Sequence, residues 1–194
     1  MVYMKQLALD NPLSGKAAVK ALEGGGVIIY PTETAYGLGA DFLNKKAVEK
    51  VYQIKGRAFN KPLPVIVSSL AMAKLLVKFD IISLELAKKY WPGPLTLVLP
   101  TKDNKGTLAL RVSGNKLATS LARQLGRPLV STSANLSGRA ECYNTDEVIK
   151  QFKGKKHQPD LILNGGLLTK NKPSTIVQVT AEGLKIIRQG AIKL

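Results

Sequence analysis

The fold is decided by Val27-Ile28-Ile29-Tyr30 and the segment that follows it, Pro31-Thr32-Glu33-Thr34-Ala35-Tyr36-Gly37-Leu38-Gly39. Four consecutive apolar residues are typical of a buried strand. The hydroxyl-rich residues 31–38 are predicted to form a loop at the carboxyl end of that strand, where open α/β sheets bind ligands. Gly24-Gly25-Gly26 comes before the strand, whereas a dinucleotide fingerprint places its glycines after one, so these glycines are interpreted as a helix stop.

Helical and strand-like segments alternate on both sides of this stretch. Strands are predicted at 27–30, 65–67, 95–99, 108–112, 128–132, 161–163, 175–179 and 184–188. Helices are predicted to begin at the N-caps Ser14, Asn44, Asn115 and Thr145, with further helices at 71–77 and 84–90. Ala181-Glu182-Gly183 is a hairpin signal, which disfavours an all-parallel sheet. The sequence therefore predicts one α/β domain over residues 1–194, a twisted mixed sheet with flanking helices.

Composition restricts the function. The chain has 194 residues, 45% of them hydrophobic, and a net charge of +16. That charge indicates anionic partners such as nucleotides or nucleic acid. A single cysteine, Cys142, excludes a disulfide framework and a multi-cysteine metal site, and a single histidine, His157, argues against a histidine metal centre. No apolar run approaches the roughly 20 residues of a membrane span, so a soluble, cytoplasmic protein is expected.

Several polar clusters could form one anion-binding site. Lys55-Gly56-Arg57 and Lys61 resemble a phosphate clamp, although cations at a helix C-terminus also simply complement the helix dipole. Arg111 stands alone between apolar neighbours and needs a partner or a cleft. The remaining candidates are hydroxyl, amide and cationic side chains near predicted strand ends, namely Thr32, Tyr36, Ser131, Ser133, Asn135, Ser174 and Arg188.

This collection contains hydroxyls, an amide and cations, but no clustered carboxylates, histidine or cysteine. Such a site is poorly suited to catalysis by a protein nucleophile. It is suited to holding a polyphosphate and aligning a second reactant, which is how phosphoryl and nucleotidyl transfers are mostly catalysed, usually with Mg²⁺ bridging phosphate oxygens.

In their chain order, the segments resemble the YrdC/TsaC family of threonylcarbamoyl-AMP synthases. The resemblance covers nearly the whole chain and rests on Pro31–Gly39, Lys55-Gly56-Arg57, Trp91-Pro92-Gly93-Pro94-Leu95-Thr96, Arg111-Val112, Ser131–Asn135, Pro173-Ser174-Thr175 and Arg188-Gln189-Gly190. It implies a YrdC/DHBP synthase-like fold. It also implies a nucleotidyltransferase that makes threonylcarbamoyl-AMP and pyrophosphate from L-threonine, bicarbonate or CO₂, and ATP. A separate threonylcarbamoyl-transfer complex would then modify the adenosine beside the anticodon in tRNAs reading ANN codons.

The resemblance also assigns residues. It places Thr32, Tyr36, Thr96, Arg111 and Ser133 at threonine. It places Lys55, Arg57, Lys61, Ser131, Asn135, Ser174 and Arg188 at the nucleotide. Lys55, Arg57 and Ser133 would be catalytic. No acidic cluster in the sequence demands a metal, so no metal ligand is predicted in the protein, and Mg²⁺ is expected to arrive with ATP and be held mainly by the phosphates.

The alternative is a non-catalytic protein that binds structured RNA, either tRNA or double-stranded RNA, for example in rRNA maturation. The net charge favours it through phosphate contacts. The candidate surface is the basic set Lys153, Lys155, Lys156, Lys170 and Lys172, which could equally be solvated lysines. Aromatic residues make up only 6% of the chain, so base stacking is not the expected mode.

Overall fold

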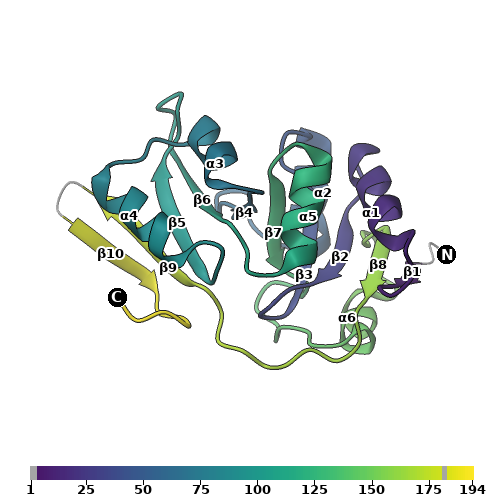
Figure 1. The fold of residues 1–194 in the computed structure, drawn as a ribbon. Helices are drawn as coiled ribbons and strands as arrows, with labels where there is room; N and C mark the ends of the chain where they lie inside the picture. Colours follow the sequence, from purple (N-terminus) through teal and green to yellow (C-terminus); the bar gives the residue numbers. More distant parts are fainter. Residues whose placement is uncertain (1–3, 181–182) are drawn as a thin grey trace.

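A single mixed sheet organises the molecule. The computed structural model describes residues 4–180 and 183–194, and ten strands within them form the order β1-β8-β2-β3-β7-β4-β6-β5-β9-β10 (Figure 1). The strands are β1 Lys5–Ala8, β2 Ile28–Pro31, β3 Tyr36–Asp41, β4 Val65–Ile66, β5 Leu95–Pro100, β6 Thr107–Arg111, β7 Leu129–Ser133, β8 Leu161–Asn164, β9 Thr175–Thr180 and β10 Gly183–Arg188. Parallel and antiparallel pairs are mixed, so the predicted sheet class is confirmed.

Six helices lie against this sheet within the described residues. They are α1 Ser14–Glu23, α2 Lys45–Lys55, α3 Leu70–Leu76, α4 Ile81–Tyr90, α5 Lys116–Leu125 and α6 Thr145–Phe152. Asn44 and Asn115 cap α2 and α5 as predicted, each accepting a hydrogen bond from the backbone three residues on. Two predicted caps are wrong by one residue, because Leu13 occupies the N-cap of α1 and Asn144 caps α6. Gly24 ends α1, which confirms the helix stop.

Strand alternation divides the apolar side chains between two cores. Val65, Val130 and Ile162 belong to the larger core, whereas their neighbours Ile66 and Leu129 belong to the smaller one. The larger core includes residues of α2, α3, α4 and α6, and the smaller core is closed by α1 and α5. Helices therefore cover one face of the sheet along most of its width, while the face of the smaller core is covered only where α1 and α5 lie.

Strand β3 corrects the prediction of a loop over residues 31–38. The strand pairs with β2 and β7 in the centre of the sheet and is fully buried. Gly37 and Gly39 are unusual in a strand and favoured the prediction of a loop, but the packing inside the sheet requires them. An added Cβ at Gly39 would lie 2.7 Å from Cε1 of Tyr30, and one at Gly37 would lie 3.2 Å from its Cζ. The Tyr30 ring therefore occupies the space that side chains would fill.

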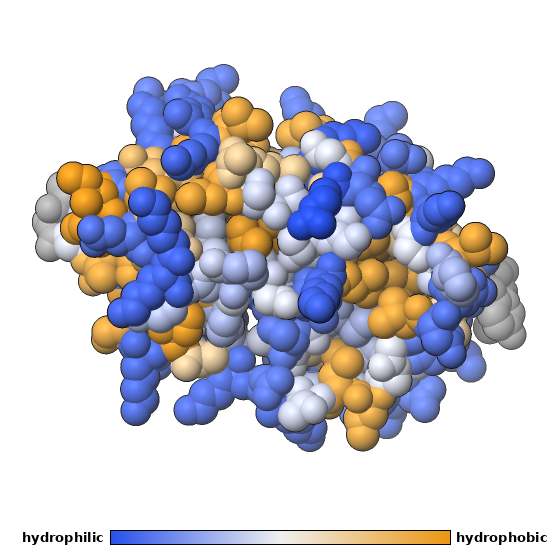
Figure 2. Space-filling model, in the orientation of Figure 1, coloured by the Kyte–Doolittle hydropathy of each residue, from blue (hydrophilic) through white to orange (hydrophobic). Residues whose placement is uncertain are grey.

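The two ends of the sheet differ from the centre. The short exposed strand β1 was not predicted, and it pairs in parallel with β8. At the other end β9 and β10 pair antiparallel, as expected from the hairpin signal, although Ala181 and Glu182 of its turn lie outside the described residues. Hydrophobic side chains gather on the β10 end of the surface, where Leu184, Ile186 and Ile187 are exposed (Figure 2). Among the described residues, no helix has the length and apolar character to span a membrane.

Candidate active site

A cavity of about 610 Å³ lies on the part of the sheet that α1 and α5 leave uncovered. Leu95, Leu97 and Leu99 of β5 point into the larger core, so Thr96 and Val98 between them face the opposite way, into the cavity. The same alternation brings Ala109 and Arg111 of β6, and Ile176 and Gln178 of β9, to the cavity wall. The alternation of side chains along these strands therefore places every second residue on the wall of the cavity.

Four cations from three parts of the chain line this cavity: Arg57 and Lys61 from one loop, Arg111 from β6, and Arg188 from β10. Arg57 follows Gly56, the left-handed C-cap of α2. Its Nε and Nη2 donate to the carbonyls of Lys61 and Pro62, each at 3.1 Å, so the loop orients the guanidinium. Nη2 of Arg188 donates to Ser174 O at 2.8 Å and to Ser174 Oγ at 3.0 Å. Four cations on the wall of one cavity are suited to a polyphosphate.

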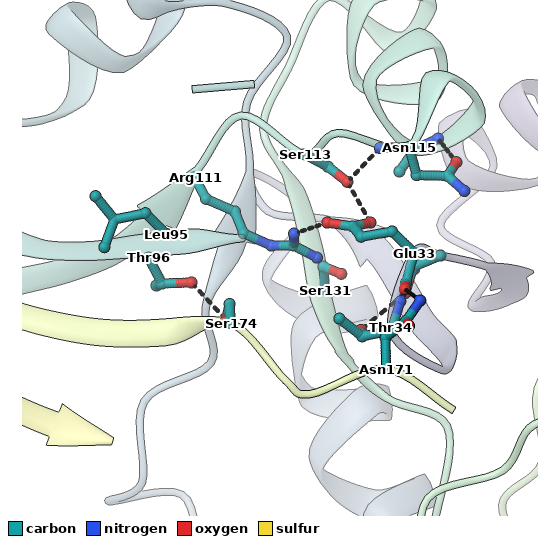
Figure 3. Close-up of polar contacts among 12 residues, drawn as sticks. Glu33, Thr34, Leu95, Thr96, Arg111, Ser113, Asn115, Ser131, Asn171 and Ser174 are labelled. Atoms are coloured by element: carbon teal, nitrogen blue, oxygen red, sulfur yellow. Dashed lines mark hydrogen bonds and ion pairs between the residues drawn. The ribbon is translucent and has the colours of Figure 1, made fainter. Parts of the chain in front are cut away.

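Hydroxyl side chains line the same cavity as the cations. Thr96 Oγ1 and Ser174 Oγ lie 2.9 Å apart (Figure 3). Tyr30 donates to Ser131 Oγ at 2.7 Å, and burial raises the pKa of Tyr30 to about 12, so its hydroxyl stays a donor. Thr32 Oγ1 donates to Ala35 O at 2.6 Å and closes the loop between β2 and β3. These groups can hydrogen-bond to small polar substrates, but they are not activated nucleophiles.

Lys55 lies behind the cavity rather than in its wall. Its side chain is buried, and Nζ donates to Ser133 O at 2.5 Å, Asn135 O at 2.9 Å and Asn135 Oδ1 at 3.1 Å. Ser133 Oγ in turn lies 2.6 Å from Asn135 Oδ1. Burial, with the nearby charge of Arg57, lowers the pKa of Lys55 to about 8. Lys55 therefore fixes the turn that presents Ser133 to the cavity.

The chain's cysteine and histidine lie outside the wall of this cavity. Cys142 is buried outside the cavity wall, and burial raises the pKa of its thiol to about 11. His157 lines a second cavity of about 610 Å³ together with Lys50, Lys153 and Lys156. Glu141 does line the first cavity, as a single carboxylate rather than as part of a pair or a triad. The arrangement favours chemistry in which the substrates supply their own nucleophile.

Comparison with known proteins identifies the family. The family model for Sua5, YciO and YrdC proteins, described as "Telomere recombination", matches residues 20–190. The chain belongs to the Sua5/YciO/YrdC family. A threonylcarbamoyl-AMP synthase of Buchnera aphidicola is 38% identical over 164 residues, which are 79% of this chain and 91% of that enzyme.

Longer members of the Sua5/YciO/YrdC family are also similar to this chain. A threonylcarbamoyl-AMP synthase of Pyrococcus abyssi is 32% identical over 188 residues, 92% of this chain and 54% of that enzyme. The crystal structure of P. abyssi Sua5 complexed with L-threonine superposes with a TM-score of 0.86 at 30% identity, covering 97% of this chain and 57% of that one. The chain therefore spans a little over half the length of these archaeal relatives.

Ten of the twelve predicted site residues line the cavity of this Sua5/YciO/YrdC protein. They are Thr32, Tyr36, Arg57, Lys61, Thr96, Arg111, Ser131, Ser133, Ser174 and Arg188. Lys55 and Asn135 are buried beside it and contact each other. The hydroxyl of Tyr36 is already used in contacts within the protein, since it donates to Gly166 O at 2.8 Å and accepts from Gly165 N at 3.0 Å. The binding roles of these residues stay predictions.

Glu33 was not among the predicted site residues, although it lies within the segment Pro31–Gly39. Glu33 forms an ion pair with Arg111 and accepts a hydrogen bond from Ser113 Oγ at 2.7 Å (Figure 3). The signal was the isolated Arg111, which was expected to need a partner or a cleft and has both.

Proposed function

We propose that this protein makes threonylcarbamoyl-AMP and pyrophosphate from L-threonine, bicarbonate or CO₂, and ATP. The observation that carries the proposal is the convergence of Arg57, Lys61, Arg111 and Arg188 on one hydroxyl-lined cavity. The threonylcarbamoyl-AMP synthase name of the Buchnera relative, which this chain matches over 91% of its length, supports the same reaction.

The nucleotide is assigned to the cationic part of the wall. Arg57, Lys61 and Arg188 would neutralise the phosphates, and Ser131 and Ser174 would offer hydroxyls to the nucleotide. Lys55 and Asn135 would act from behind, by holding the turn at Ser133. Preorganised donors of this kind lower a barrier because they need not reorient as charge moves onto the leaving pyrophosphate.

Threonine is assigned to the side of the cavity at the loop between β2 and β3. Thr32 and Thr96 would surround the amino acid together with Tyr36, whose hydroxyl is already bonded to Gly165 and Gly166. Arg111 would face an anionic oxygen, and Ser133 would lie between the two substrates. The L-threonine complex of P. abyssi Sua5, which shares the fold at a TM-score of 0.86, supports threonine as a ligand.

The chemistry needs no protein nucleophile. The neutral amine of threonine attacks CO₂, loses a proton and becomes a carbamate. A carbamate oxygen then attacks the α-phosphorus of ATP, and the bond from that phosphorus to the β-phosphate oxygen breaks, which releases pyrophosphate. The residues of the wall align the two reactants and stabilise charge, and alignment alone supplies about 7–11 kcal/mol in well-oriented reactions.

Magnesium enters this proposal as part of the substrate MgATP. Within residues 4–180 and 183–194 there is no group of three His, Cys, Asp or Glu side chains that could hold a metal. The donor set therefore fits an ion that is bound mainly by triphosphate oxygens, and Mg²⁺ typically binds in this way.

Pyrophosphate release tests the proposed reaction. We expect release only when ATP, L-threonine and bicarbonate are all present, because the carbamate is the attacking group. Each single omission should reduce the rate to background, and L-serine in place of L-threonine gives a matched control for amino-acid selectivity. ATP turnover at an equal rate without threonine would show that the reaction is a different one.

The product implies further partners. We propose that a separate complex transfers the threonylcarbamoyl group from this product to tRNA. We also propose that the tRNA, or another structured RNA, contacts this protein at the second cavity. That cavity is lined by Lys50, Lys153, Lys155, Lys156 and His157. Lys50 is already paired with Asp160 at 2.6 Å, which leaves the three lysines of the 153–156 segment for phosphates. A cytoplasmic location, where ATP and tRNA occur together, stays a prediction.

Salt dependence tests the RNA contact. Replacing Lys153, Lys155 and Lys156 with alanine should weaken tRNA binding about tenfold and reduce the slope of log affinity against log salt by about 2–3, because three phosphate contacts are lost. The matched control replaces Lys16, Lys20 and Lys74, which are exposed on α1 and α3, outside the second cavity. Equal slopes for both triple variants would contradict the proposal.

A further inference from the structure

Glu33 connects three segments that surround the active-site cavity. Its carboxylate pairs with Nη1 of Arg111, and its Oε2 accepts from Ser113 Oγ at 2.7 Å. Its carbonyl oxygen accepts from Nδ2 of Asn171 at 2.9 Å. Figure 3 shows Arg111 reaching across from β6 toward Glu33, in front of the strand that carries Ser131. One acidic residue thus holds β6, the turn into α5 and the segment before β9 together.

The ion pair spans the middle of the sheet. Glu33 belongs to the loop between β2 and β3, and Arg111 ends β6, yet β7 and β4 separate β3 from β6 in the strand order. Arg111 is 9% exposed and Glu33 is partly exposed. Burial by itself raises the pKa of Glu33, but the charge of Arg111 and the hydrogen bonds outweigh it, so the pKa lies below its ordinary value. Glu33 is therefore ionised at neutral pH.

Arg111 has donors left for a substrate. Its guanidinium carries five N–H groups in a fixed fork. Among the described residues, the protein contacts of this guanidinium use Nη1, while the side chain lines the cavity. Ser113, which holds the other carboxylate oxygen of Glu33, is itself fixed by the backbone N–H of Asn115, the N-cap of α5, at 3.1 Å. The orientation of Arg111 is thus set through Glu33 by a helix end.

We propose that Glu33 is a positioning residue, which holds Arg111 so that its remaining N–H groups face an anionic oxygen of the bound substrates. The proposal rests on the proposed function and extends it to a residue that does not line the cavity. The anionic oxygen could belong to the carboxylate or carbamate of threonine, or to a phosphate of ATP. Kinetics with each substrate varied separately will distinguish the two.

The charge balance gives this role a signature of its own. Glu33 offsets the charge of Arg111, so removing the carboxylate adds one positive charge at the cavity. An anion such as pyrophosphate should then bind at least as tightly as before, while turnover falls because Arg111 is no longer held in place. If Glu33 were needed only for folding, its replacement would weaken pyrophosphate binding and reduce turnover together.

The experiment compares Glu33→Gln with the wild-type chain. We expect kcat to fall about 100-fold, the loss associated with small misplacements of a catalytic group. The dissociation constant for pyrophosphate, measured by calorimetry, should stay equal or decrease. The KM that rises, for threonine or for ATP, identifies the oxygen that Arg111 faces. Glu23→Gln, an exposed position at the end of α1, is the matched control and should leave both readouts unchanged.

A double-variant comparison completes the test. In an Arg111→Ala background, Glu33→Gln should lower kcat less than twofold further, because the residue it positions is already absent. A full additional 100-fold loss, a wild-type kcat for the single variant, or weaker pyrophosphate binding in that variant would each overturn the proposal. If the wild-type chain itself releases no pyrophosphate, the proposed function fails, whereas the calorimetric comparison still decides whether Glu33 compensates Arg111.

Discussion

Arg57→Ala is expected to lower the rate of pyrophosphate release by about 100- to 1,000-fold, the range seen when one preorganised charge-stabilising donor is removed from an active site. Arg57 lines the cavity, and its guanidinium is oriented by the carbonyls of Lys61 and Pro62. Both contacts are made from an exposed loop, so the free energy of unfolding should change by less than about 1 kcal/mol.

Arg123→Ala is the matched control for Arg57→Ala. Arg123 is exposed in the last turn of α5, outside the cavity wall, and its loss should alter neither rate nor stability beyond experimental scatter. Ser133→Ala should follow Arg57→Ala in direction, because Ser133 lines the cavity. If the melting temperature of Arg57→Ala falls in proportion to its activity, Arg57 is a structural residue and its assignment to the phosphates is wrong.

Lys55→Met should differ from Arg57→Ala by losing stability as well as activity. Methionine preserves the buried stem but removes the ammonium, which leaves the carbonyl of Asn135 without a donor. The other two oxygens keep a partner, since Ser133 O still accepts from Asn135 N and Asn135 Oδ1 from Ser133 Oγ. One unsatisfied buried acceptor costs about 1–3 kcal/mol, so we expect denaturant unfolding to show a loss in that range. The rate should fall about 100-fold, because the turn that presents Ser133 is released.

The pH dependence of the wild-type chain checks the same role of Lys55. Its pKa in the folded chain is about 8, below the ordinary value of 10.5. Above pH 8 the amine keeps two N–H groups for three oxygens, so the rate should fall as pH rises. Between these two values the unfolded chain binds the proton more tightly, so the contribution of this group to stability increases with pH. Activity should therefore be lost above pH 8 without unfolding; a rate that stays level to pH 10 would contradict this role.

The role of Lys55 could have been distinguished from that of Arg57 by its position on the helix. The prediction grouped Lys55 with Arg57 because both are cations at the end of one helix. The helical period separates them, since Lys55 follows Val51 by four residues and Tyr52 by three, and all three are buried. Position on the apolar face was the available signal, and it distinguishes a cation that supports the site from one that lines it.

Local patterns predicted the helices and eight of the strands, because caps and apolar periods act over a few residues. They failed at β3, where Gly37 and Gly39 have low strand propensity and are retained because the ring of Tyr30 packs against them. Local patterns also could not predict the Glu33–Arg111 pair, since the two residues are 78 positions apart in the sequence. Their contact depends on the strand order, in which β7 and β4 lie between β3 and β6. Contacts of this kind depend on topology rather than on sequence spacing.

A crystal structure with L-threonine and a non-hydrolysable ATP analogue would show directly whether both substrates bind in the one cavity. We expect the triphosphate between Arg57 and Arg188 and the amino acid between Thr32 and Arg111. Binding of the triphosphate in the second cavity, at Lys153 and Lys156, or of the two ligands too far apart to react, would contradict it.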